Sequence, residues 1–98
     1  MFDDPLSRAL CLYVGYERLQ IPARQAEEVV RAFGPERAMT LTPKLDEILD
    51  YAVGRTIGVE IDLPNIGRDA ANAARRKYPS LSRKARKAIA WYVSQHWQ

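Results

Sequence analysis

The sequence predicts an all-α protein, a single compact bundle of about five helices that spans residues 1–98. Three observations support this prediction. Apolar residues recur at helical spacing in five separate stretches. Proline, glycine and capping residues mark the ends of most of these stretches. No linker is long enough to divide two domains, and a chain of this length can bury one hydrophobic core.

The first predicted helix covers residues 5–19. Asp4 supplies a capping acid and Pro5 a proline at the first helical position. Gly15 lies inside this stretch at a cost of roughly 1 kcal/mol against alanine, so we expect another helix to cross closely there. The apolar face begins with Leu6, Ala9, Leu10, Tyr13 and Tyr16.

The second predicted helix covers residues 22–33, and Gly34 followed by Pro35 ends it. Oppositely charged residues four positions apart are expected to pair along its exposed face. These pairs are Arg24–Glu28 and Glu27–Arg31. The apolar stripe consists of Ala26, Val29, Val30 and Phe33.

Residues 35–41 are expected to form a connector, and a third helix is predicted over residues 43–57. Thr42 is a capping residue and Pro43 suits the first helical position, which together form a strong start signal. The buried stripe of this helix comprises Leu45, Ile48, Leu49, Ala52, Val53 and Ile57.

Residues 59–63 alternate apolar and polar, but no second strand is available to pair with them, so we expect an extended connector. A fourth helix is predicted over residues 66–77 and a fifth over residues 81–97. Pro79 breaks the chain between them, and Ser80 or Ser82 caps the last helix. The two buried faces are Ile66, Ala70, Ala73, Ala74 and Tyr78, then Leu81, Ala85, Ala88, Ile89, Tyr92 and His96.

Charge is unevenly distributed along the chain. Residues 1–65 contain 11 acidic and 7 basic side chains, whereas residues 66–98 contain 1 acidic and 8 basic side chains. The first part therefore carries a net charge of −4 and the second +7. Cations at the start of a helix oppose its macrodipole, so the basic run of the last helix is either a solvated face or a functional surface.

The sequence contains no motif for catalysis or metal binding. One cysteine and one histidine cannot form a typical metal site. Cys11 is interpreted as a small buried hydrophobe, and His96 as a partly buried helix residue. We expect no enzyme activity, cofactor or metal. The acidic N-terminus lacks the cationic start of a signal peptide, and the longest apolar run, Ala9 to Val14, is too short to cross a membrane. A soluble cytoplasmic protein is expected.

The segment Tyr78 to Ser82, followed by the helix AIAWYVSQHW, resembles the C-terminal end of small all-helical bacterial immunity proteins of the contact-dependent growth inhibition or bacteriocin type. The resemblance covers about twenty residues. It implies stoichiometric blockade of a cognate toxin domain. Many such toxins are nucleases with basic clefts, so an acidic face would dock there with steered association. The candidate residues are Asp46, Glu47, Asp50, Glu60 and Asp62.

Two features of the sequence leave other functions open. The net charge of +3 departs from the acidic character of nuclease inhibitors, so the basic end is an alternative docking surface for an acidic toxin. The same residues also suit a nucleic acid, because cations neutralise phosphates and tryptophans stack on bases. An adaptor anchored by its tryptophans is a third hypothesis. The residues concerned are Arg75, Arg76, Lys77, Arg83, Lys84, Arg86, Lys87, Trp91 and Trp97.

Overall fold

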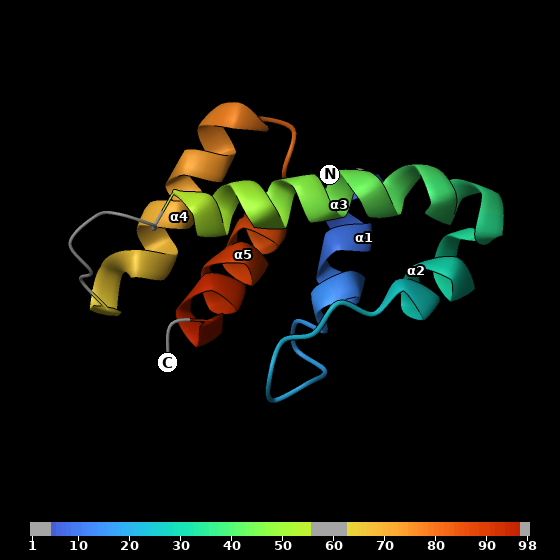
Figure 1. Ribbon diagram of the computed structural model, residues 1–98, viewed down its shortest axis with the longest axis horizontal. Helices are drawn as coiled ribbons and strands as arrows, with labels where there is room; N and C mark the ends of the chain where they lie inside the picture. Colours follow the sequence, from blue (N-terminus) through green and yellow to red (C-terminus); the bar gives the residue numbers. More distant parts are fainter. Residues whose placement is uncertain (1–4, 56–62, 97–98) are drawn as a thin grey trace.

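The computed structural model describes residues 5–55 and 63–96. Within this part of the chain it contains five α-helices and no strand, which confirms the predicted all-α bundle. Figure 1 shows α3 running along the long axis of the molecule, while α4 and α5 run in opposite directions. The helices are α1 (Pro5–Val14), α2 (Ala26–Phe33), α3 (Pro35–Gly54), α4 (Leu63–Lys77) and α5 (Arg83–His96).

One hydrophobic core holds the five helices together, and every helix contributes to it. Its largest fully buried apolar side chains are Leu10, Val14, Val29, Leu45, Ile48, Leu49, Ile89 and Val93. Helix α4 contributes mainly alanines, which allow it to lie close to α5. Ser7 of α1 is fully buried, and its Oγ accepts a hydrogen bond from the backbone N–H of Ser82 at 2.8 Å. This bond attaches the beginning of α5 to α1.

The first helix ends earlier than predicted, because Gly15 terminates it instead of lying inside it. Gly15 has φ +81°, a left-handed conformation that favours glycine. The following segment returns to α1: the backbone N–H of Ala23 donates to Val14 O at 3.1 Å, and that of Gln25 to Tyr13 O at 2.8 Å. Helix α2 therefore begins at Ala26 and not at residue 22. Of its predicted apolar stripe only Val29 is buried.

The third helix begins eight residues before the predicted start. Pro35 occupies its first turn, and Pro43 lies inside it, so the connector predicted at residues 35–41 is helical. An interior proline costs about 3 kcal/mol. The earlier start places Ala38 in the core and Leu41 against it, and this burial offsets part of the cost. Gly34, with φ +89°, ends α2 as predicted and directly precedes α3.

The last two helices match the prediction most closely. The break at Pro79 separates α4 from α5, and Ser82 Oγ caps α5 by accepting the Ala85 N–H at 3.1 Å. The predicted buried alanines of both helices are buried. His96 is an exception, because it is exposed at the end of α5 and Val93 takes the inner position. Helix α4 begins at Leu63, three residues before the predicted start, and α5 begins at Arg83, two residues after it. Leu63, the last residue of the predicted connector, is therefore helical, and residues 59–62 lie outside the described residues.

The close helix crossing expected at Gly15 occurs instead at Gly67, where α4 meets α5. A Cβ atom added at Gly67 would collide with the Ala90 carbonyl oxygen and the Ser94 hydroxyl. By contrast, a Cβ atom at Gly54, near the end of α3, would meet nothing within 4 Å. The two helical glycines therefore have opposite roles: Gly67 is required by packing, whereas Gly54 only weakens its helix.

We predict that Gly67→Ala destabilises the protein by about 1–3 kcal/mol, because the added methyl group forces α4 and α5 apart. Gly54→Ala is the matched control, and we expect it to be neutral or to stabilise the protein by up to about 1 kcal/mol. Urea unfolding followed by circular dichroism measures both values. Equal effects of the two substitutions would contradict the close crossing.

Candidate functional site

The acidic residues of α3 predicted as a docking face are engaged by neighbouring side chains. Asp46 Oδ1 accepts a hydrogen bond from the Tyr13 hydroxyl at 2.7 Å and another from Arg24 Nη1 at 3.0 Å. Asp50 Oδ1 accepts one from Arg24 Nη2 at 2.8 Å. The like-charge pair Asp46–Asp50 is thus bridged by a single guanidinium.

Arg24 connects three parts of the fold. Besides its two aspartate partners on α3, its Nε donates to the Tyr92 hydroxyl of α5 at 3.0 Å, and its guanidinium lies 5.6 Å from the centre of the Tyr92 ring. Its side chain is 32% exposed and that of Asp50 70%, so each ion pair alone contributes little. The N–H groups of the Arg24 guanidinium lie in one plane, so all three contacts form together only when the partners occupy these positions.

Glu47, the third acid of this face, has a similar arrangement. It pairs with Lys44 at 3.0 Å and accepts a hydrogen bond from the Tyr78 hydroxyl at 3.1 Å. These two contacts lower the pKa of Glu47. Burial and the bond to Glu47 raise the pKa of Tyr78 to about 12, and burial with the bond to Asp46 raises the pKa of Tyr13 to about 12. Glu60 and Asp62 lie outside the described residues.

The ion pairs predicted along the second helix are wrong. Arg24 precedes α2 and reaches α3 instead of Glu28. Arg31 pairs with Glu28 at 2.8 Å, three residues before it, and not with Glu27. The spacing rule fails here because it assumes that Arg24 is helical, whereas the chain around it folds back onto α1.

The basic side of the molecule has a different character from the acidic one. A hollow of about 280 Å³ lies between α4 and α5. Four cationic side chains line it, together with Asn72 and the small side chains Ala71 and Ala90, and none of the lining residues is acidic. The cations are Arg68 of α4 and Arg83, Arg86 and Lys87 of α5.

Arg75 extends this surface along α4, because it follows Arg68 by seven residues and so lies on the same side of the helix. We call Arg68, Arg75, Arg83, Arg86 and Lys87 the basic face. Within the described part of the chain, no salt bridge joins any of the five to a carboxylate, and none of the five has an aromatic ring beneath it.

The remaining predicted basic residues lie elsewhere. Arg76 is exposed beside the basic face, whereas Lys77 Nζ lies 4.3 Å from the centre of the Tyr51 ring, on the side of α3. Lys84 pairs with Glu17 at 2.9 Å. Trp91 is half-buried with its ring 5.8 Å from that of Tyr16, and Trp97 lies outside the described residues.

Arg68 is absent from the residues predicted from the sequence, because that prediction grouped the cations by their proximity along the chain. The available signal was helical spacing, since Arg68, Asn72 and Arg75 recur at steps of four and three on one side of α4. The pairing of that side with the start of α5 is a tertiary feature, and periodicity alone does not predict it.

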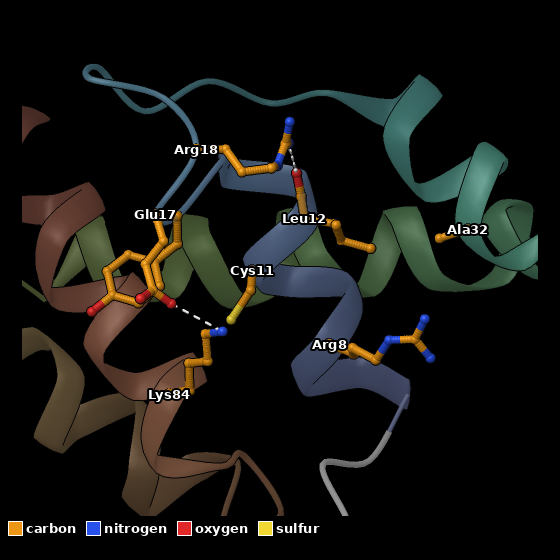
Figure 2. Close-up of a pocket in the computed structure, with 8 residues that line it drawn as sticks. Arg8, Cys11, Leu12, Glu17, Arg18, Ala32 and Lys84 are labelled. Carbon is orange, nitrogen blue, oxygen red and sulfur yellow. Dashed lines mark hydrogen bonds and ion pairs between the residues drawn. The ribbon is translucent and has the colours of Figure 1, made fainter.

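A second hollow, of about 370 Å³, lies between α1, α2 and α5 (Figure 2). Cys11 lines it and is half-buried against the core, so it is more accessible than predicted. The cations around it are already engaged: Arg18 donates to Leu12 O at 3.1 Å, and Lys84 pairs with Glu17. Arg8 lies over the Phe33 ring. This hollow is therefore less suited to an anion than the one between α4 and α5.

Two other kinds of site are absent from the described residues. No three or more of their histidine, cysteine, aspartate and glutamate side chains cluster in a way that would hold a metal ion. None of the helices in the same residues combines the length and the apolar character that crossing a bilayer requires.

Comparison with protein-family models, with curated proteins and with solved structures finds no match for this chain.

We predict that Arg24→Met destabilises the protein by about 1–2 kcal/mol, because it removes the contacts to Asp46, Asp50 and Tyr92 together. Arg31→Met is the matched control, since Arg31 is 74% exposed and has one partner within its own helix; we expect a change within about 0.5 kcal/mol. Urea unfolding distinguishes the two, and equal losses of stability would show that Arg24 makes only an ordinary surface contact.

Proposed function

We propose that the protein binds nucleic acid through the basic face of α4 and α5. The observation that supports this proposal is the concentration of cations on one helix pair, which have no carboxylate partner among the described residues, in a chain with an isoelectric point near 9.2. Such a surface attracts a polyanion, and each phosphate that it neutralises releases condensed counterions.

The arrangement of acids supports the same proposal. Asp46, Glu47 and Asp50 face Arg24, Lys44 and two tyrosine hydroxyls, so their charge is largely compensated within the fold. These three acids do not line the α4–α5 hollow, and none of the residues that line it is acidic. The cations therefore act on approaching ligands with little local compensation.

The expected mode of recognition is contact with backbone phosphates, with little discrimination between sequences. Trp91, predicted as a stacking residue, is half-buried against Tyr16 and does not present a free ring to a base. Arginine and lysine contacts to phosphate position a protein on nucleic acid but carry no sequence information. A cytoplasmic location, expected from the sequence, is compatible with such a ligand.

Toxin neutralisation, implied by the resemblance to bacterial immunity proteins, is the second candidate. One observation favours a changed version of it: Asp46, Glu47 and Asp50, the described acids of the expected docking face, form ion pairs within the fold. The hollow of the basic face, by contrast, is lined by arginines together with Ala71 and Ala90. Arginines are common at protein interfaces. In this version the toxin domain presents an acidic surface to α4 and α5.

The test is titration of the full chain with labelled RNA and DNA oligonucleotides at increasing salt concentration. We predict binding that persists near 150 mM salt, with a linear dependence of log affinity on log salt. A triple variant, Arg68→Gln with Arg75→Gln and Arg83→Gln, should reduce the steepness of that dependence by about three, roughly one for each phosphate that is no longer neutralised.

The control has the same net charge but keeps the basic face intact: Arg31→Gln with Arg37→Gln and Arg55→Gln, three exposed arginines on α2, on α3 and just after α3. We expect it to retain the slope of the unmodified protein. Equal reductions of the slope in both variants would reject a defined face. Absence of binding above low salt would reject nucleic acid as the partner and leave toxin neutralisation as the candidate.

A further inference from the structure

Arg86 has an unsatisfied donor beside the α4–α5 hollow. Its Nε is buried and has no hydrogen-bond partner among the residues that the structure describes. Buried polar groups are nearly always paired, because an unpaired donor loses its hydration without compensation. An unpartnered group in a folded protein therefore calls for an explanation, and an absent ligand is one.

The surroundings of Arg86 favour an anion. Arg68, Arg83 and Lys87 line the same hollow, and no acidic side chain lines it. Like charges held this close repel one another, and an anion between them relieves that repulsion. Arg83 and Arg86 also lie in the first turn of α5, where the macrodipole is positive and favours negative charge.

The hollow is open to solvent, and its size is sufficient for a small anion. About 280 Å³ holds a phosphate group together with a few water molecules. Ala71 and Ala90 also line the hollow, and their small side chains leave its space open. Close packing at Gly67 against Ala90 fixes the separation of the two helices at this point.

From these observations we infer that the α4–α5 hollow is an oxyanion site that holds one phosphate group, with Arg86 as its principal donor. The inference deepens the proposed function and rests on it for the source of the phosphate. Arg86 offers Nε–H and a terminal N–H as a planar fork that matches two oxygens of a phosphate. Because Nε is buried, the guanidinium must turn toward the hollow when the anion enters. Arg68, Arg83 and Lys87 supply surrounding charge.

The test uses inorganic phosphate as the probe and the full chain as the receptor. Isothermal titration and the melting temperature are measured in phosphate and in sodium chloride of equal ionic strength. We expect saturable binding and a saturable rise in melting temperature with phosphate only. Arg86→Lys keeps the charge but removes the fork, and should weaken phosphate binding at least about tenfold. Arg55→Lys, the same change at an exposed arginine outside the basic face, should alter it less than about twofold.

A second variant keeps the site testable if Arg86→Lys does not fold. Arg83 is exposed, so Arg83→Gln should fold normally and still weaken phosphate binding. Chloride and phosphate acting alike on the unmodified protein would overturn the site. Equal effects of Arg86→Lys and Arg55→Lys would overturn the assignment to Arg86.

Oligonucleotide binding in the presence of phosphate distinguishes the sources of the ligand. Competition by phosphate at constant ionic strength would support both the site and the proposed function. Phosphate binding without any oligonucleotide binding would support the site, reject the proposed function and identify free phosphate as the ligand. Oligonucleotide binding without phosphate binding would reject the site and leave the proposed function standing.

Discussion

The guanidinium of Arg24 connects two aspartates of α3 with a tyrosine of α5. Arg24 donates to Asp46 and Asp50 of α3 and to Tyr92 of α5 at distances of 2.8–3.0 Å, from a segment that precedes α2. The contact joins elements that are 22 to 68 residues apart in the chain. It also brings two like-charged aspartates on successive turns of α3 into one compensated cluster. Without Arg24 these carboxylates would repel each other and project a negative field.

The charges of the rest of the molecule are unevenly distributed over the helices. The printed ion pairs place Asp46, Glu47 and Asp50 of α3 beside Arg24 and Lys44. Helices α4 and α5, by contrast, carry eight basic residues and a single acidic one, Asp69. The uneven charge along the sequence thus becomes an uneven charge in space. Placing cations at the start of α5 is locally unfavourable, and the anion that we propose at the α4–α5 hollow would compensate this charge.

Local signals predicted the fold where tertiary contacts did not oppose them. Pro79 and Ser82 marked the boundary before α5, and alanines at helical spacing marked the buried side of α4. The prediction failed at Pro43, because the helix continues through this proline and the turns before it contribute Ala38 to the core. It also failed to find the partners of Arg24 and the role of Arg68, since both depend on which helices pack together, and periodicity identifies faces but not neighbours.

Ligands are expected to meet the protein at α4 and α5 and not at the compensated acids of α3. Backbone amide chemical shifts, recorded by nuclear magnetic resonance during titration with an RNA oligonucleotide, test this expectation residue by residue. We predict perturbations centred on Arg68, Asn72, Arg83, Arg86 and Lys87, with little change around Asp46 and Asp50. Perturbations centred on Asp46 and Asp50, or spread evenly over the surface, would contradict the account.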